Sequence, residues 1–404
     1  MTKKSILILV VLYLVSTAVA FAGYTVINKN ATVAQVQDAQ NADQQTSDDT
    51  SPAGKLLTIS PSEAKDQPCP LNGQMFTNTE KAAWEKRRPL AVMIENTPDA
   101  RPQSGLTNAD LVFEAMAEGG ITRFEAYFYC NAQASDIQLA PIRSARQYYF
   151  EIASGFNYPL YVHVGGANTP GPADALAHIG DAGWNTQNDM NQFSIGFPTF
   201  VRDYNRIPGK VIATEHTMVT STEKLWTYAA QKRGWTNIAP ARTIAGKNVA
   251  ASDWKAGFTP WSFQESTPVT SPTATTISYA FWDGFSDYSV QWDYDAAQNG
   301  YKRSEGGAAH TDLNNTQQIE VKNVVVIMAD EKGPIDTEKH MLYGLSGATG
   351  NALFFQNGTA FKGTWSKKDR ESNFVFTDDK GKAVKFVRGP IWISVGGKTM
   401  SVKY

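Results

Sequence analysis

The stretch RPQSGLTNADLVFEAMAEGGITRFEAYF at residues 101–128 decides the fold. Residues 109–116 and 121–129 each place apolar side chains alternately on two faces, which is the pattern of a β-strand. The apolar run PLAVMIEN at residues 89–96 is typical of a buried strand. Because helical patterns lie between and after these strands, we expect an α/β layered N-terminal domain over residues 67–245.

The signals from residue 246 to residue 404 are mostly β. Short apolar runs alternate with turn residues, and Asn357-Gly358 is a typical hairpin turn. Seven of the ten tryptophans lie between Trp235 and Trp392, which suits a core between two sheets. The sequence therefore predicts a mixed α/β, or α+β, fold in which a mainly antiparallel β domain follows the N-terminal domain.

The N-terminus predicts a transmembrane signal anchor over residues 1–28. Two lysines precede an uncharged segment, and its apolar part, residues 6–27, can span a hydrocarbon core of about 30 Å as a helix. The lysines favour a cytoplasmic N-terminus, which leaves the rest of the chain outside the membrane. A cleaved signal peptide is the competing interpretation, because Ala20-Phe21-Ala22 fits a small-x-small cleavage site.

Residues 29–66 predict a disordered extracytoplasmic linker. They are rich in Ala, Gln, Asp, Ser and Thr, and they contain no aromatic side chain. Such a segment buries too little apolar surface to offset the entropy lost on ordering.

The overall charge excludes one class of function. The chain has 37 basic and 39 acidic residues and a net charge of −2. A nucleic-acid-binding protein usually carries a basic excess, so we expect no nucleic-acid partner.

Cys69 and Cys130 are the only cysteines of the chain. Outside the cytoplasm such a pair can form a disulfide. Two unpaired cysteines, with Cys130 in a core strand, are the alternative, and the sequence leaves both open.

Arginines of the central region are the first candidate ligand-binding residues. If a helix begins near Pro141, Arg143 and Arg146 lie one turn apart at its positive end, where a carboxylate or phosphate can bind. With Arg123 they form the predicted anion site. The alternative is an internal ion-pair network with a local carboxylate, namely Glu114, Glu118 or Glu125.

The strand LYVHVGG at residues 160–166 supplies the predicted rim of this site. His163, Gly165 and Gly166 stand at its carboxyl end, where open α/β sheets hold ligands. A structural histidine is the alternative for His163. The five histidines show no metal-binding spacing, and nothing in the sequence indicates a cofactor.

Carboxylates of the same region suggest a second chemistry. Glu118 or Glu114, assisted by His163, are the candidate catalytic residues for acid/base cleavage of a glycosidic bond. Ion-paired or solvated acids are the alternative, because sequence does not give the separation of the carboxylates.

Several long motifs resemble the YerB-like family of bacterial proteins. They are RPQSGL, ADLVFE, AEGGITRF, PIRSAR, YVHVGG and YKRSEGGAAHTD, and the resemblance covers roughly residues 85–400. It implies a membrane-attached, extracytoplasmic protein with N-terminal and C-terminal parts of unknown function, and it brings no established catalytic residue. The chain lacks the lipid-attachment cysteine of the family, so a helical anchor is its natural substitute. Ala140 stands where the family has a glycine.

These observations predict a single-pass protein of the bacterial cell membrane whose bulk is extracytoplasmic. We expect it to bind an anionic or glycan component of the cell wall. A cell-wall hydrolase or transferase is the first alternative. A scaffold that contacts an envelope protein partner is the second.

Overall fold

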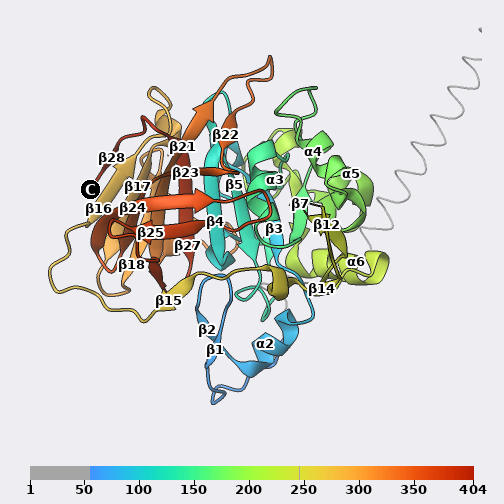
Figure 1. Ribbon diagram of the computed structural model, residues 1–404, viewed down its shortest axis with the longest axis horizontal. Helices are drawn as coiled ribbons and strands as arrows, with labels where there is room; N and C mark the ends of the chain where they lie inside the picture. The colour runs from blue at the N-terminus through green and yellow to red at the C-terminus, as the bar shows by residue number, and fades with distance from the viewer. Residues whose placement is uncertain (1–54, 245) are drawn as a thin grey trace, which may run out of the picture. The chain divides into compact units, whose positions relative to one another are not determined.

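A mixed sheet of eleven strands runs through the centre of the protein (Figure 1). The computed structural model describes residues 55–244 and 246–404. In pairing order the strands of this sheet are β25 (Val375–Asp378), β24 (Thr359–Lys367), β23 (Ala348–Gln356), β21 (Asn323–Lys332), β27 (Ile391–Gly397), β4 (Leu111–Glu118), β5 (Ile121–Phe128), β3 (Leu90–Glu95), β7 (Leu160–His163) and β8 (Asp189–Asn191), and β22 (Leu342–Gly344) pairs with β21.

Strands from both halves of the sequence form the middle of this sheet. β27 lies between β21 and β4 and runs parallel to both, with Ile391 opposite Leu111 and Val395 opposite Ala115. The first six residues of β27 are buried, and such a strand needs a partner on each edge for its backbone groups. The predicted boundary between residues 245 and 246 therefore does not separate two sheets. The mixed α+β fold itself is confirmed.

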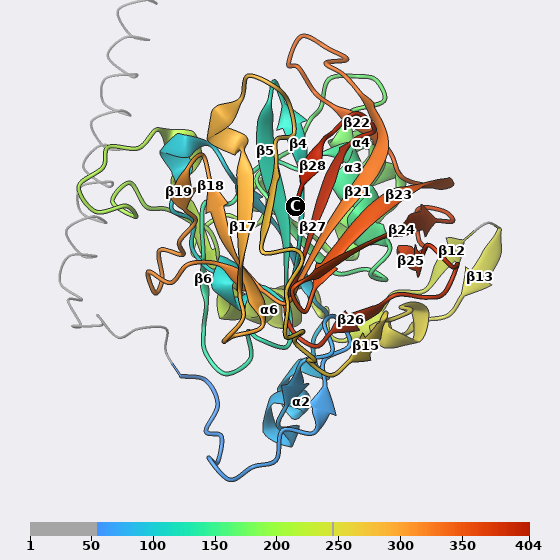
Figure 2. The ribbon, with the colours of Figure 1, turned by 90° about the vertical axis from the view of Figure 1, so that its left-hand side faces the viewer.

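A smaller sheet of six strands packs on one face of the large sheet (Figure 2). Trp292 of the smaller sheet meets Trp392 of β27 with their ring centroids 5.5 Å apart, so tryptophans do fill the space between two sheets. The strands of the smaller sheet are β19 (Ala308–Ala309), β18 (Gly300–Glu305), β17 (Val290–Asp295), β16 (Thr276–Tyr279), β28 (Val402–Lys403) and β20 (Glu320–Val321).

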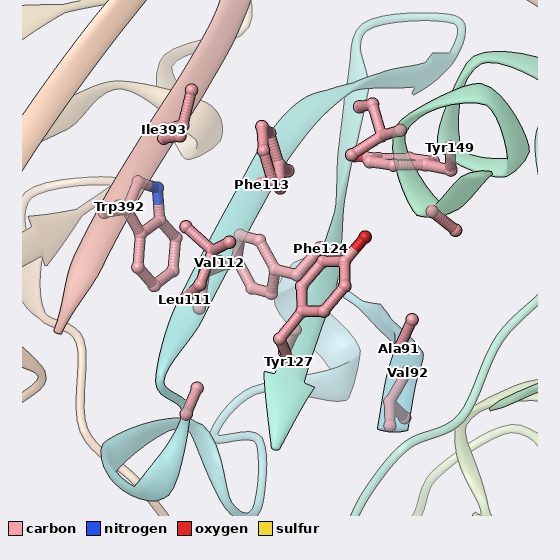
Figure 3. Packing of buried hydrophobic residues seen from close by; sticks show 14 of the residues in the cluster. Ala91, Val92, Leu111, Val112, Phe113, Phe124, Tyr127, Tyr149, Trp392 and Ile393 are labelled. Carbon is pink, nitrogen blue, oxygen red and sulfur yellow. The ribbon is translucent and has the colours of Figure 1, made fainter. Parts of the chain in front are cut away.

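Helices cover part of the opposite face of the large sheet. The hydroxyl of Tyr149 in α3 accepts a hydrogen bond from the backbone N–H of Ala115 in β4 at 2.8 Å. Aromatic side chains such as Phe113 and Tyr127 fill the space between (Figure 3). The α-helices of the described residues are α2 (Asn78–Trp84), α3 (Gln147–Ser154), α4 (Ala175–Asp181), α5 (Gln192–Ile195) and α6 (Thr222–Arg233).

Short strands complete the fold at its periphery. Asn357 and Gly358 form the predicted hairpin turn, between β23 and β24, and both have positive φ. The short strands are β6 (Gln138–Leu139), β10 (Met218–Ser221) and β9 (Val201–Arg202), which form one sheet, and the pairs β1 (Gln67–Pro68) with β2 (Met75–Phe76), β11 (Ile238–Ala239) with β14 (Ser252–Asp253), β12 (Arg242–Ile244) with β13 (Lys247–Val249), and β15 (Ser262–Gln264) with β26 (Lys385–Val387).

The predicted helix start at Pro141 is wrong. Residues 141–146 are extended, and α3 begins only at Gln147 with Arg146 as its N-cap. The backbone N–H of Arg143 donates to the carbonyl of Met93, and the N–H of Ala145 donates to that of Gly165. These bonds to Met93 within β3 and to Gly165 just after β7 replace the hydrogen bonds that a helix would make here.

The predicted membrane anchor over residues 1–28 and residues 29–54 of the predicted linker lie outside the described residues. Within the part of the chain that the structure describes, no helix is long and apolar enough to cross a membrane. The end of the predicted linker belongs to the folded part, because Lys55 pairs with Ser135 and Glu63 accepts the backbone N–H of Thr79 at 2.8 Å.

Candidate functional site

Glu118 is the centre of the predicted arginine site. It stands at the end of β4, and one carboxylate oxygen accepts from Arg123 at 2.7 Å while the other accepts from Arg146 at 2.6 and 3.1 Å. The remaining amino groups of the two arginines donate to the carbonyls of Ser144 and Ala145. Two of the three predicted arginines are thus buried and held by an internal carboxylate.

Arg143 is the exception among these arginines. Its Nε lies 3.4 Å from Glu95, whose other oxygen lies 2.8 Å from Nδ1 of His216. Its side chain is 28% exposed, and among the described residues its guanidinium makes no hydrogen bond. Arg143 is therefore the member that can still take an external anion. We call Arg123, Arg143, Arg146, Glu95 and Glu118 the arginine cluster.

The ionisation of Glu118 argues against a general-acid role for this residue. Burial alone would raise its pKa, but the charges of Arg123 and Arg146 outweigh burial and lower that pKa to about 2. A general acid has to hold a proton near the working pH. Glu118 is ionised at neutral pH and does not supply this proton.

His163 is buried rather than placed on an open rim. Its two ring nitrogens lie 2.7 Å from the carbonyl oxygen of Gly165 and 2.6 Å from a carboxylate oxygen of Asp189. The ring of Phe193 lies so close to Gly165 that an added Cβ would come within 2.9 Å of it. The predicted rim formed by His163, Gly165 and Gly166 is therefore covered by the chain itself, and Leu176 covers Gly166 in the same way.

Glu114 lies on the opposite face of the large sheet from the arginine cluster. It pairs with Phe124 across β5, whereas the neighbouring Ala115 pairs with Arg123. Both of its carboxylate oxygens accept from Arg303 at 2.9 Å, and it is fully buried. Alternation alone would place Glu114 and Glu118 on one face, but the strand register shifts between Met116 and Glu118, and Glu118 meets Arg123 instead. Glu114 and Glu118 therefore do not act together.

A buried polar network surrounds Arg303, and the sequence did not predict it. Arg303 contacts Glu305 at 3.0 Å, and it donates to Nδ1 of His310 at 2.6 Å. Nε2 of His310 then donates to the side chain of Gln103 at 2.8 Å, and Asn96 donates to Glu305 at 2.7 Å. The signal was present in the motifs RPQSGL and YKRSEGGAAHTD, which the fold brings together here. This junction network consists of Asn96, Gln103, Glu114, Arg303, Glu305 and His310.

The junction network joins the two halves of the chain rather than presenting free groups. Arg101, Glu305 and His310 line a cavity of about 330 Å³. Arg101, however, donates to the carbonyls of Asn96 and Asp287 and lies 3.5 Å from Glu305. Burial, helped by the nearby charge of Arg303, lowers the pKa of His310 to about 3, so its imidazole is neutral. The geometry is that of a structural polar core.

The two cysteines form a disulfide in a buried polar environment. Cys69 and Cys130 are bonded, and Asp110 beside them accepts the backbone N–H groups of Tyr129 and Cys130 at 2.7 and 2.9 Å. Burial raises the pKa of Asp110 to about 7 although these hydrogen bonds oppose the shift. In the described residues these three side chains also form the one grouping close enough for a metal ion. The disulfide consumes both thiols, so they do not form a metal site.

Glu125 provides no alternative partner for the arginines. It is fully buried and accepts a hydrogen bond from the hydroxyl of Tyr127. Burial raises its pKa well above the ordinary range, which disfavours the charged form that an ion pair with arginine needs.

Comparison with known families defines the class of this protein. The model of the N-terminal domain of a protein family of unknown function, DUF3048, matches residues 76–236, and the model of its C-terminal domain matches residues 279–393. The chain therefore belongs to the DUF3048 family.

A particular relative comes from Bacillus subtilis strain 168. The chain is 30% identical over 341 residues to the protein named "Putative lipoprotein YerB", across 83% of this chain and 88% of that protein. The crystal structure of YerB from Bacillus subtilis matches with a TM-score of 0.62 and 27% identity, covering 84% of this chain and 100% of the other. The predicted family resemblance is confirmed, and the relative's name is consistent with an extracytoplasmic protein of the cell envelope.

Proposed function

We propose that the protein is a single-pass, membrane-attached envelope protein that binds an anionic component of the cell wall through Arg143. The binding and the location are supported by separate observations.

Three observations support the location. The apolar run at residues 6–27 has the length and the preceding lysines of a membrane anchor. The disulfide between Cys69 and Cys130 suits an oxidising compartment outside the cytoplasm. The relative from Bacillus subtilis carries the word lipoprotein in its name.

The uncommitted guanidinium of Arg143 is the single observation that carries the binding proposal. Arg143 is held from one side by Glu95 through Nε, which leaves its two terminal amino groups free for a carboxylate or phosphate. The arginine cluster contains three arginines and two glutamates, so it has one positive charge in excess. An anion at Arg143 would neutralise that charge.

The rest of the cluster supports Arg143 without binding the ligand itself. The backbone of residues 143–145 is fixed by hydrogen bonds to Met93 and Gly165. Arg146 and Arg123 are locked by Glu118. Such a support fixes the position of Arg143 before a ligand arrives, which lowers the entropic cost of binding.

Co-sedimentation with isolated cell-wall sacculi tests this proposal. The full chain, kept soluble in mild detergent, is mixed with sacculi at low and high salt. Arg143→Ala removes the proposed contact, and Arg233→Ala on the exposed end of α6 is the matched control for loss of one arginine. We expect salt-sensitive pelleting that the control variant retains and Arg143→Ala loses, with unchanged thermal unfolding.

Two outcomes would overturn the proposal. Equal pelleting of Arg143→Ala and the control would remove Arg143 as the contact. No pelleting of any of the proteins would exclude wall binding and favour an envelope protein partner. Release of soluble wall fragments would instead support the hydrolase alternative.

A further inference from the structure

A cavity in the described residues lies far in sequence from the arginine cluster. Residues that lead into β25, at the edge of the large sheet (Figure 2), line it. It has a volume of about 820 Å³, within the range of small-ligand sites. One wall is Gly257 and residues 259–262, which lead into β15, and another is residues 371–376, which lead into β25. Residues 347–349 and 366–368 also line the cavity. The sequence did not predict this site, because its two walls are more than a hundred residues apart.

Hydrogen bonds between side chains and backbone hold the walls of this cavity in place. Nζ of the buried Lys367 donates to the carbonyls of Arg370 and Ser372, each at 2.6 Å. Asn373 donates to the carbonyl of Thr259 at 3.1 Å and so joins the two walls. The cavity is therefore preformed, which favours ligand binding because little ordering is needed.

Trp261 supplies a flat apolar surface in this cavity. Its indole N–H donates to the carbonyl of Phe374 at 2.7 Å, which fixes the ring. The ring packs on Phe376 and Phe386 with centroid distances of 5.4 and 5.3 Å, and the side chain remains half-buried. An aromatic ring held in this way can stack against the apolar face of a ligand ring.

Hydroxyl groups surround this apolar surface. Thr259, Ser262 and Ser366 line the cavity, and among the described residues their hydroxyls make no hydrogen bond. Each hydroxyl can both donate and accept, as the hydroxyls of a sugar can. We propose that this cavity binds a short oligosaccharide, whose rings have apolar faces and hydroxyl-rich edges.

An extended peptide suits this cavity less well. A peptide would bind most simply by adding a strand to the outer edge of β25. That edge is already covered, because the N–H of Val384 donates to the carbonyl of Phe376 and the N–H of Asp378 donates to that of Lys382. The backbone groups that such a peptide needs are therefore in use.

Titration of the full chain in mild detergent with triacetylchitotriose, followed by calorimetry, tests the proposal. We expect saturable binding that weakens about fivefold or more in Trp261→Ala, since an aromatic contact of this kind contributes about 1 kcal/mol or more. Ser262→Trp places a bulky group in the cavity from an exposed position and should have the same effect without removing a packed side chain. Ser271→Trp, at an exposed serine outside the cavity, is its matched control.

The outcomes separate this site from the anion site. Arg143→Ala should bind the sugar as the unmodified protein does, so failure of wall binding through Arg143 leaves this test intact. The proposal is overturned if no saturation occurs up to about 10 mM sugar, which corresponds to a binding free energy weaker than about −3 kcal/mol. It is also overturned if Ser262→Trp binds unchanged, or if trialanine binds in the cavity and the sugar does not.

Discussion

Glu118 accepts two hydrogen bonds from Arg146 on the same carboxylate oxygen, at 2.6 and 3.1 Å. The two residues come from the end of β4 and the start of α3, so the bond ties the helix to the sheet. It also means that the anion bound by this arginine is part of the protein. The carboxylate of Glu118 therefore occupies the position at which the sequence predicted a ligand.

Glu118→Gln should destabilise the protein in a pH-dependent way. The folded-state pKa of Glu118, about 2, lies below its ordinary value of 4.5. The stabilisation by its charge is therefore complete above about pH 4.5 and is lost as the pH falls towards 2. We expect Glu118→Gln to lower the free energy of unfolding by about 2 kcal/mol at pH 7 and by much less at pH 2.5. Urea unfolding at the two pH values measures this difference, and an equal loss at both would contradict it.

His310→Gln should make the protein less sensitive to mild acid. Burial, with the charge of Arg303, lowers the pKa of His310 from 6.5 to about 3. Between these values the unfolded chain binds a proton that the folded protein does not, so stability falls as the pH falls below 6.5. Removing this group should reduce the loss of stability between pH 7 and pH 5 by about 2 kcal/mol. Parallel denaturant titrations at both pH values test it, and identical pH slopes would exclude the effect.

Arg303→Met should be among the most destabilising single changes in the protein. It leaves the fully buried Glu114 and Glu305 without their shared cation, which costs about 3–5 kcal/mol for a broken buried ion pair. Adding Glu114→Gln should restore part of the loss, because one uncompensated carboxylate disappears. Denaturant unfolding of both variants measures the coupling.

The neighbouring Lys302→Met serves as the control for this prediction. Lys302 lies on the same strand, and its ammonium group pairs with Asp295 at the surface. Exposed pairs contribute little, so this variant should unfold like the unmodified protein. A loss as large as that of Arg303→Met would mean that β18 itself, rather than the buried charge, sets the stability.

Reduction of the disulfide should destabilise the folded part without changing its structure. Cys69 and Cys130 are separated by 61 positions, and closing a loop of that length restricts the unfolded chain by about 4 kcal/mol. We expect Cys69→Ala/Cys130→Ala, which leaves no free thiol, to lose about 2–4 kcal/mol. Thermal unfolding with and without reductant tests it. The double variant should not respond to reductant, and a response would indicate an unrelated effect.

Local patterns in the sequence predicted much of the fold but not the connections between its halves. The alternation of residues 109–116 and the apolar run at residues 89–96 identified β4 and β3. This was possible because the apolar pattern within a strand reflects which of its own side chains are buried. The position of β27 beside β4 has no local signal, since Ile391 and Leu111 are almost three hundred positions apart. For the same reason the junction network around Arg303 was not predicted.

The residues of the candidate site could be identified from the sequence, but their pairing could not. The sequence identified Arg143 and Arg146, with Glu114, Glu118 or Glu125 as the ion-pair alternative. It could not decide between a free and an internally paired arginine, because that depends on how β4 and α3 meet. The helix expected at Pro141 failed because backbone bonds to Met93 and Gly165 hold this segment extended.

The sequence alone determined the family, the mixed composition of strands and helices, and the prediction of an apolar N-terminal segment suited to a membrane. These properties follow from local periodicity, composition and motifs. Tertiary structure alone decided that Arg123 and Arg146 are paired, that His163 is covered, and that Arg143 keeps free donors. It also decided that two distant walls enclose a cavity beside Trp261. Ion pairing and concavity depend on distances of a few ångströms between segments far apart in the chain, and only the folded chain fixes those distances.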